Sequence, residues 1–360
     1  MSREVLILGG YGNFGKRIAA GLARHGVAMI IAGRDGAKAE AMAAGLPGAR
    51  ALVVDITGDV EAVLRREKPV VVVHTCGPFQ GADYGVARAC LEAGIAYIDL
   101  ADGRDFVRDF VGLDGEAKAA GVSLVCGAST VPGLSSAVIE RFRGDFGRIE
   151  SVDFGITPGQ KTERGLATVA AILSYVGKKL RPWAGHDRAY GWQDMRAHDY
   201  PVFGRRWLAN CEIPDLDLLP AAYGLRSVTF GAGVELGFMQ WALWLLSWPV
   251  RWRWPLDLTR FAGVLLMASR WFDGLGSHTG GMHVVMRGVG LDGQALTRTW
   301  HVVAEKGDGP NIPCVPAIVL ATRLAKGEAM PAGARACVGL VSLEDYLREL
   351  EPLAVTTFEG

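Results

Sequence analysis

The stretch EVLILGGYGNFG, residues 4–15, decides the fold of this chain. It begins as a short apolar strand and continues as a glycine-rich turn. The apolar residues of the next segment, 16–25, have helical spacing. Gly10, Gly12 and Gly15 therefore form a Gly-x-Gly-x-x-Gly motif between a strand and a helix, which is the context in which this motif indicates dinucleotide binding.

Each glycine of the motif has an expected purpose. Gly10 would permit the tight turn, Gly12 would let a pyrophosphate approach the backbone, and Gly15 would let helix and strand pack closely. The amides at the start of the helix would face the phosphates. A purely structural glycine turn is the alternative. The cofactor-binding residues expected in this turn are Gly10, Tyr11, Gly12, Asn13, Phe14 and Gly15.

Strands and helices alternate along the first 135 residues. This alternation predicts an α/β fold, a Rossmann-type doubly wound parallel sheet. Its ligand should lie across the carboxyl ends of the strands. The expected strands are 4–8, 28–32, 51–54, 70–74, 96–100 and 123–126, and the expected helices are 16–25, 37–44, 60–66, 84–93 and 106–120.

The end of the second expected strand should select the nicotinamide cofactor. Arg34 stands there, and a guanidinium suits the 2′-phosphate of NADP. Asp35 follows and could instead face the ribose hydroxyls of NAD. We expect NADP, with NAD or a surface arginine without a ligand as alternatives. Asp55, after the third strand, could meet the adenine edge or be an ordinary polar strand end.

Several later motifs carry a family resemblance. The segments HTCGPF (74–79), GIAYID (94–99), GASTVPG (127–133) and GDGPNIP (307–313) resemble the saccharopine dehydrogenase-like oxidoreductases. That family has a Gly-Pro-aromatic turn after strand four, a Tyr-x-Asp in strand five and a Pro-Gly turn entering the second domain. The likeness is good over residues 4–135 and 276–345 and poor between them. It implies NAD(P)-dependent hydride transfer.

The resemblance also implies a domain organisation. Residues 1–135, with the C-terminal segment 305–360 packing back, would form the NAD(P)-binding domain. Residues 136–304 would form an α+β domain with the substrate pocket and the contacts of a homodimer. In that domain we expect strands near 149–156, 227–232, 282–288 and 295–303, a hairpin at Asp292-Gly293, a helix over 162–176 and a loop-rich stretch over 182–220.

Two residues after the fourth strand could transfer protons. His74 and Cys76 are the candidate catalytic groups, and a structural histidine is the alternative for His74. The backbone of Cys76, Gly77 and Pro78 would form a platform for the nicotinamide. Among the other polar residues nearby, Asp99 and Tyr84 are weaker candidates, and Tyr97 and Cys126 are expected in the core.

A competing motif occurs later in the chain. Tyr175 and Lys179 have the Tyr-x-x-x-Lys spacing of the catalytic pair of short-chain dehydrogenases. In that family the pair lies between strands five and six of the sheet, whereas here it follows strand six. An amphipathic surface helix is the alternative that we favour.

The middle of the chain is rich in tryptophan, and nine of the ten tryptophans lie between Trp183 and Trp271. Residues 236–248 read LGFMQWALWLLSW, with Gln240 and Ser247 as the only polar side chains. A helix of this length spans about 20 Å, less than the ~30 Å of a bilayer core. With a second apolar helix near 258–272, it predicts a helical pair, 236–272, that lines a pocket, forms a dimer contact or attaches to a membrane surface.

Composition narrows the classes of function. Thirty-eight basic residues balance thirty-eight acidic ones, which argues against a nucleic-acid partner. The six cysteines are widely spaced and give no metal-site spacing, and no signal peptide is recognisable, so we expect a cytoplasmic protein, with membrane association through 236–272 as the alternative. We therefore expect an NADP-preferring oxidoreductase acting on an apolar carbonyl, imine or enoyl small molecule. The alternative is a non-catalytic NAD(P)-binding protein that is membrane-peripheral or redox-sensing.

Overall fold

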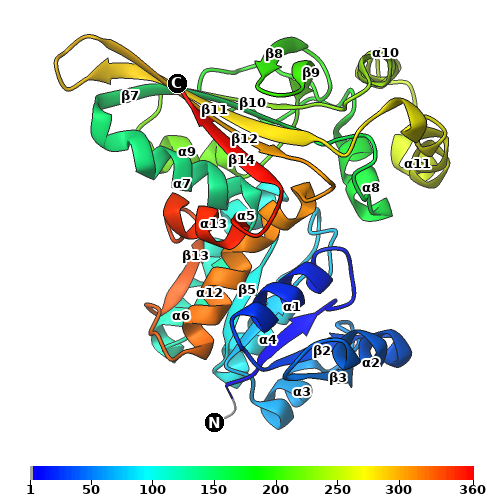
Figure 1. Ribbon diagram of the computed structural model, residues 1–360, viewed down its shortest axis with the longest axis vertical. Coiled ribbons are helices and arrows are strands. Elements are labelled where there is room, and N and C mark those ends of the chain that lie inside the picture. Colours follow the sequence, from blue (N-terminus) through cyan, green and yellow to red (C-terminus); the bar gives the residue numbers. More distant parts are fainter. Residues whose placement is uncertain (1–2) are drawn as a thin grey trace. The chain divides into compact units, whose positions relative to one another are not determined.

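A computed structural model describes residues 3–360 (Figure 1). The chain forms two compact units. Unit 1 comprises the residues up to Ala137 together with Asn311–Glu349, and unit 2 comprises Val138–Pro310 together with Leu350–Gly360. All of 305–360 was expected to pack with the first domain, whereas residues 305–310 and the residues from Leu350 onward belong to unit 2. The physical reason is that the last strand hydrogen-bonds to the sheet of unit 2.

Unit 1 is built on a seven-stranded parallel sheet with the order β13-β6-β5-β4-β1-β2-β3. This confirms the predicted Rossmann-type sheet. Its edge strand β13 was not predicted, because four mostly small residues show neither an apolar run nor alternation. The strands are β1 (Val5–Leu8), β2 (Met29–Gly33), β3 (Ala49–Val53), β4 (Val71–His74), β5 (Ala96–Asp99), β6 (Ser123–Cys126) and β13 (Gly333–Ala336).

Two helices of unit 1 from opposite ends of the chain pack together. Gly21 of α1 allows this approach, because a Cβ atom there would lie 2.5 Å from Cδ1 of Ile318 in α12. The helix expected over 106–120 is divided by a 3₁₀ turn at Phe110–Leu113, which buries both of those end residues. The helices are α1 (Gly15–Arg24), α2 (Gly36–Ala44), α3 (Val60–Glu67), α4 (Gly85–Ala93), α5 (Arg104–Asp109), α6 (Asp114–Ala120), α12 (Val315–Ala325) and α13 (Leu343–Leu350).

Unit 2 contains a second seven-stranded sheet with the order β14-β12-β11-β7-β10-β9-β8. Only β10 and β7 are parallel among its pairs, so the sheet is mixed and the predicted α+β character is confirmed. The predicted hairpin at Asp292-Gly293 joins β11 and β12. The strands are β7 (Phe146–Thr157), β8 (Arg196–Tyr200), β9 (Gly204–Asn210), β10 (Ser227–Ala232), β11 (Gly280–Gly290), β12 (Ala295–Ala304) and β14 (Val355–Glu359).

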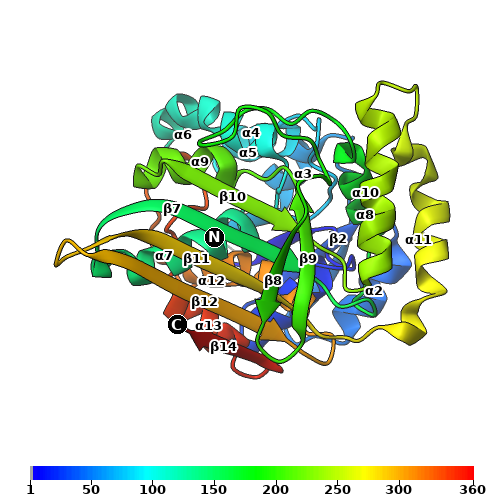
Figure 2. The ribbon, with the colours of Figure 1, turned by 90° about the horizontal axis from the view of Figure 1, so that it is seen from above.

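The stretch 182–220, expected to be loop-rich, contains two strands and the start of a helix. Strand β8 reads RAHDY and β9 begins GRR, so their polar residues hide the apolar alternation that predicts a strand. Figure 2 shows α10 and α11, the predicted helical pair, side by side. No helix among residues 3–360 is both long and apolar enough to cross a membrane. The remaining helices are α7 (Ser135–Phe142), α8 (Leu166–Tyr175), α9 (Asp215–Tyr223), α10 (Gly237–Arg251) and α11 (Ala262–Arg270).

Candidate cofactor site in unit 1

The order of the strands places the candidate site. The chain runs from β1 outward to β2 and β3 and then returns to β4 on the other side of β1. Such a switch point is where parallel α/β sheets bind ligands. Thr75, just after β4, joins the two sides, since its backbone N and its Oγ1 donate to the Leu8 carbonyl oxygen over 3.0 and 2.8 Å. The glycine turn and the segment after β4 therefore meet at one edge of the sheet.

The glycine turn differs from the expectation in one residue. Gly9 has a φ of 79° and supplies the left-handed backbone of the turn, a purpose that the sequence analysis gave to Gly10. A Cβ on Gly9 would also lie 2.7 Å from Oγ1 of Thr75. Gly10 instead allows the turn to pack on β2, where a Cβ would lie 2.9 Å from Cγ2 of Ile31. The Gly-Gly doublet directly after β1 is the signal that could have identified Gly9.

Gly15 is required by close packing within the turn. A Cβ at this position would lie 2.2 Å from the carbonyl oxygen of Gly9, which is far inside van der Waals contact. A Cβ on Gly12 would lie 3.0 Å from the same oxygen, a much milder approach. The start of α1 thus rests directly on the backbone of the turn that precedes it.

The start of α1 presents backbone donors. Within residues 3–360, the amides of Asn13, Phe14 and Gly15 have no backbone acceptor, as expected for a helix N-terminus. Arg17 lies beside them and donates through Nη1 to both the carbonyl and the side-chain oxygen of Asn13. Free amides next to a guanidinium suit an anion such as a pyrophosphate. Arg17 was not predicted as a site residue from the sequence. Its position in the first turn of α1, directly after the glycine motif, is the signal that could have identified it.

Tyr11 links the glycine turn to the end of β2. Its ring lies against Gly33, where a Cβ would come within 2.4 Å of Tyr11 Cε1. Its hydroxyl accepts a hydrogen bond of 3.0 Å from the backbone N of Asp35. The turn, the end of β2 and the residues after it are thereby held together.

Arg34 and Asp35 differ in what they already bind. The Asp35 carboxylate caps α2, accepting from the backbone N of Lys38 over 3.1 Å and pairing with its ammonium at 3.1 Å. The hydrogen bond from the Lys38 amide lowers the pKa of Asp35. Arg34 is exposed and forms no hydrogen bond or ion pair with the part of the chain that the structure describes. At the end of β2, the cation is therefore available to a ligand and the carboxylate is engaged.

Asp55 is also engaged by its own loop. It accepts hydrogen bonds of 3.0 and 2.9 Å from the backbone N and Oγ1 of Thr57. The first of these bonds is the main cause that lowers the pKa of Asp55, and the positive charge of Arg34 lowers it further. Asp55 thus lies near Arg34 while its own hydrogen bonds are local.

The two candidate proton-transfer groups are both uncharged near neutral pH. His74 ends β4 in a buried position, where its Nδ1 lies 3.0 Å from the Tyr97 hydroxyl, and Nε2 has no partner within residues 3–360. Burial lowers the pKa of His74 to about 4. Burial raises the pKa of the Cys76 thiol to about 11. Neither side chain is poised as an acid or a base of pKa near 7.

The remaining candidates have structural partners. Asp99 is fully buried, and its Oδ1 accepts from the backbone N of Ala101 and Gly127 over 2.9 and 2.7 Å, which ties β5 to the turn after β6. Burial raises the pKa of Asp99 to about 6.

The other candidates near the end of β4 also have partners within the fold. Tyr84 donates to the Phe106 carbonyl over 2.8 Å. After β4, the backbone N of Gly77 donates to the Thr75 carbonyl over 3.1 Å, and Pro78 follows. Tyr97 and Cys126 are buried.

The competing Tyr-x-x-x-Lys motif does not form a helical pair. Helix α8 ends at Tyr175, so Lys179 lies beyond it, in an isolated bridge with Tyr190. Both residues belong to unit 2, whereas the switch point belongs to unit 1. The arrangement required for a short-chain dehydrogenase pair is therefore absent from this motif.

Comparison with known proteins agrees with this geometry. Residues 5–125 match the family model of the saccharopine dehydrogenase NADP binding domain. The chain is similar in structure to saccharopine dehydrogenase (L-Glu forming) from Saccharomyces cerevisiae, with a TM-score of 0.69, 15% identity and 99% of each chain covered. The predicted resemblance is confirmed, and the chain has the fold of saccharopine dehydrogenase. The family model supports a nicotinamide cofactor.

Two other solved structures are more distant. Amine dehydrogenase from Mycobacterium smegmatis has a TM-score of 0.46 at 13% identity, with 93% of this chain and 94% of that chain covered. GenD2 from gentamicin A biosynthesis, in complex with NAD, has a TM-score of 0.42 at 13% identity, with 98% and 92% covered. No curated protein matches this sequence.

Proposed function

We propose that this protein is an NADP-preferring oxidoreductase that transfers a hydride between the nicotinamide and an apolar carbonyl, imine or enoyl compound. The observation that carries the cofactor preference is the contrast at the end of β2. Arg34 is exposed and unpaired among residues 3–360, while the Asp35 carboxylate caps α2. An unpaired guanidinium can bind a 2′-phosphate with charge-assisted hydrogen bonds.

The residues of unit 1 fit a dinucleotide. The free amides of Asn13, Phe14 and Gly15 would hold the pyrophosphate, and the absence of a side chain at Gly12 would let it approach. Arg34 would hold the 2′-phosphate, and Asp55 would lie toward the adenosine. The backbone of Cys76, Gly77 and Pro78, held beside the glycine turn through Thr75, would support the nicotinamide. When bound, the cofactor supplies or accepts the hydride.

The side chains at and just after the end of β4 would help to place the substrate and to exclude water from the site. His74 is uncharged and hydrogen-bonded to Tyr97, so its imidazole would form an uncharged polar part of the site lining at the end of β4. The Cys76 thiol is protonated and would shield the site in the same way. Hydride transfer to a carbonyl, an imine or an activated alkene depends first on placement over the ring and on the exclusion of water. The concentration of nine of the ten tryptophans between Trp183 and Trp271 favours an apolar substrate.

The test of the cofactor assignment is a comparison of NADPH and NADH binding. Arg34→Ala should weaken NADPH binding by roughly ten- to a hundredfold, the effect of losing one or two hydrogen bonds to a charged group, and should leave NADH binding nearly unchanged. Asp35→Asn is the matched control, because an asparagine still caps α2. Equal losses for the two cofactors in Arg34→Ala would disprove the 2′-phosphate assignment. No saturable binding of either cofactor to the wild-type protein would disprove the function as a whole.

The burial of His74 and its hydrogen bond with Tyr97 favour a second candidate function, a cofactor-binding protein without turnover, such as a redox sensor, because this side chain is engaged within the fold. A panel of carbonyl, imine and enoyl compounds separates the two. Tight NADPH binding with no turnover across the panel would favour the sensor, and turnover of any apolar member would favour the enzyme.

A further inference from the structure

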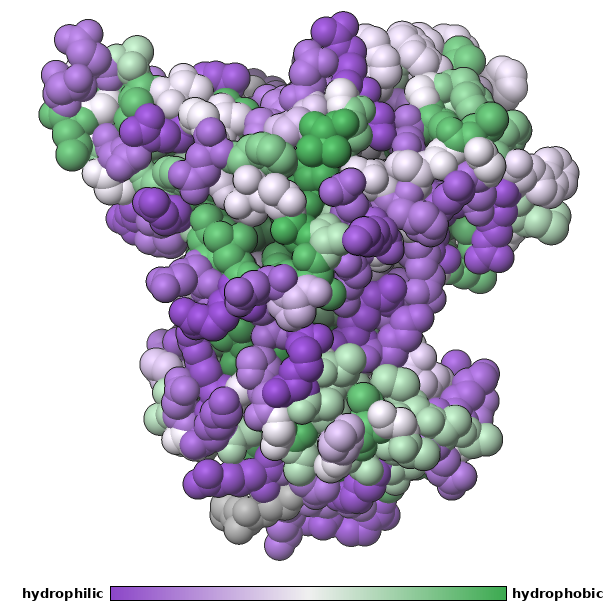
Figure 3. All heavy atoms as spheres, viewed as in Figure 1, coloured by the Kyte–Doolittle hydropathy of each residue, from purple (hydrophilic) through white to green (hydrophobic). Residues whose placement is uncertain are grey.

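Helices α10 and α11 of unit 2 carry an unusual concentration of exposed apolar side chains. Of the seventeen large hydrophobic side chains that are exposed among the described residues, eleven lie between Phe238 and Leu275. Figure 3 shows green and pale spheres gathered where α10 and α11 lie in Figure 1. We call this surface the aromatic face; it comprises Phe238, Trp241, Leu245, Trp252, Trp254, Phe261, Val264, Met267, Trp271, Phe272 and Leu275.

The exposed residues follow helical spacing on both helices. On α10 and at its C-terminal end they are Phe238, Trp241, Leu245 and Trp252. On α11 they are Val264 and Met267, and Phe261 and Trp271 flank that helix at spacings of three and four residues. Residues at such steps lie on one side of a helix. Each helix therefore presents a continuous apolar stripe to its surroundings.

In helix α10 the burial of polar and apolar side chains is the reverse of that in a helix on a water-exposed surface. Its two polar side chains in the segment 236–248, Gln240 and Ser247, are completely buried. Gln240 Oε1 accepts from the backbone N of Val234 over 3.1 Å, and Ser247 Oγ accepts from Gln193 Nε2 over 3.0 Å. A helix that buries its polar side chains while Phe238, Trp241 and Leu245 are exposed is suited to apolar surroundings.

The tryptophans of α10 form an ordered series. The rings of Trp241, Trp244, Trp248 and Trp252 follow one another with centroid separations of 5.5, 5.5 and 5.7 Å, the first two edge to face. These ring contacts hold the tryptophan side chains in fixed positions. The exposed rings therefore need no rearrangement to meet a partner. Tryptophan is the residue that is most typical of the boundary between water and a bilayer.

The charges around the aromatic face are predominantly basic. Residues 237–276 contain four arginines and two aspartates and no lysine or glutamate, whereas the whole chain is balanced. Both aspartates are paired, Asp257 with Arg260 at 3.5 Å and Asp273 with Arg164 at 2.9 Å. Arg253 and Arg270 are exposed and form no hydrogen bond through their side chains or ion pair within residues 3–360. Their charges are therefore available to an anionic surface.

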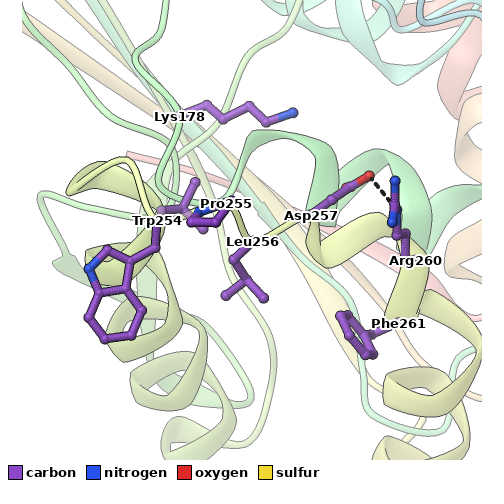
Figure 4. A pocket seen from close by; sticks show the side chains of 8 residues that line it. Lys178, Trp254, Pro255, Leu256, Asp257, Arg260 and Phe261 are labelled. Carbon is purple, nitrogen blue, oxygen red and sulfur yellow. Dashed lines mark ion pairs between the residues drawn. The ribbon is translucent and has the colours of Figure 1, made fainter.

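A pocket of about 520 Å³ lies in the connection between the two helices. Its lining combines the apolar side chains of Trp254, Leu256 and Phe261 with the cation of Lys178 and with the ion pair of Asp257 and Arg260 (Figure 4). Apolar walls with nearby cations match the acyl and phosphate parts of a lipid at the level of its headgroup.

We propose that the aromatic face docks unit 2 on the surface of an anionic phospholipid bilayer. The exposed tryptophans and leucines enter the headgroup region, and Arg253, Arg270 and Lys178 meet the lipid phosphates. The helices lie in the plane of the surface, consistent with the lack of a spanning helix among residues 3–360. This proposal does not depend on the proposed function, because vesicle binding is measured without cofactor or substrate.

The test is flotation of the full-length protein with vesicles of phosphatidylcholine mixed with phosphatidylglycerol, and with vesicles of phosphatidylcholine alone. The wild-type protein should float with the anionic vesicles and be released by salt, because screening weakens the attraction. Brominated lipids should quench its tryptophan fluorescence. No flotation with anionic vesicles at low salt would overturn the proposal, and so would equal binding to the two kinds of vesicle.

Two variants separate the apolar and basic contributions. The triple variant Trp252→Ser, Trp254→Ser and Trp271→Ser should abolish flotation, and the double variant Arg253→Glu and Arg270→Glu should weaken it by roughly tenfold or more. The matched controls are Val202→Ser with Leu291→Ser, which are exposed hydrophobics elsewhere in unit 2, and Lys306→Glu with Lys326→Glu. Controls that weaken flotation as much as the test variants would contradict the proposal. A dimer in solution that the triple variant dissociates, without vesicle binding, would assign the face to a second copy of the chain instead.

Discussion

The glycine turn of unit 1 and the aromatic face of unit 2 use opposite means to prepare a surface for a ligand. In the turn, side chains are absent where backbones approach, and Gly15 leaves no room for even a methyl group against Gly9. On the aromatic face, tryptophan and phenylalanine side chains are exposed while Gln240 and Ser247 are buried. The first surface offers hydrogen-bond donors to an anion, and the second offers apolar area with basic residues nearby. In both regions the departure from an ordinary globular surface is the observation on which the proposal rests.

The largest expected effect compares two tryptophans of unit 2. Trp192 is 1% exposed and packs in a core cluster with Leu173 and Leu258, whereas Trp271 is 76% exposed. Trp192→Ala should lower the free energy of unfolding by about 3–5 kcal/mol because it leaves a cavity. Trp271→Ala should change it by less than about 0.5 kcal/mol. Denaturant unfolding measures both, and a large loss in Trp271→Ala would mean that the aromatic face is part of the core.

The next effect concerns pH and His74. The pKa of His74 is lowered from its ordinary 6.5 to about 4 by burial, so the unfolded chain takes up a proton before the folded one does as pH falls. Stability from this residue is present above pH 6.5 and is lost between about pH 6.5 and 4, by up to about 3 kcal/mol. Asp99, whose raised pKa is about 6, acts in the opposite direction, because its stability contribution declines as pH rises toward 6.

The measurement is the unfolding free energy of wild type minus that of His74→Phe across this pH range. The difference should shrink, or move in favour of the variant, as pH falls, since phenylalanine takes up no proton. Tyr97→Phe removes the hydrogen-bond partner but keeps the imidazole, and it should retain the pH dependence. A difference that stays constant with pH would show that His74 does not titrate in this way.

The smallest of the three effects compares two glycines of the turn. Gly15→Ala should cost about 2–3 kcal/mol of stability, because its Cβ would lie 2.2 Å from a backbone oxygen that cannot move alone. Gly12→Ala should cost about 1 kcal/mol or less, because its Cβ would lie 3.0 Å from the same oxygen, and it should chiefly weaken cofactor binding. Thermal unfolding and a cofactor titration distinguish the two. Equal stability losses would contradict the assignment of separate purposes to these glycines.

Regular patterns made the first sheet predictable. Strand β4 is a continuous β-branched run before His74, and the turn after β1 carries its motif in the correct context. Strands β8, β9 and β13 were not predictable, because their polar or small residues become strand only through pairing with neighbours. The position of the last strand was equally hidden, since its partner β12 is distant in sequence.

The candidate site shows the same division. The sequence identified Arg34 and Asp35 together but left open which of them faces the cofactor. In the structure the Asp35 carboxylate caps α2, whereas Arg34 is exposed, and the proposed preference for NADP rests on this difference. The tight turn was assigned to Gly10 and not to Gly9, because a left-handed φ is a property of the folded turn and not of the motif.

What the sequence determined by itself is local: the strand–turn–helix that begins unit 1, the arginine after β2, and an apolar helix rich in tryptophan followed by a second apolar helix. Local patterns suffice there because helical and strand periods are set by neighbouring residues. The tertiary structure alone decided which side of α10 faces outward, since that depends on Gln193, 54 residues away in the chain, donating a hydrogen bond to the buried Ser247. Buried polar groups need partners, and those partners come from distant parts of the chain.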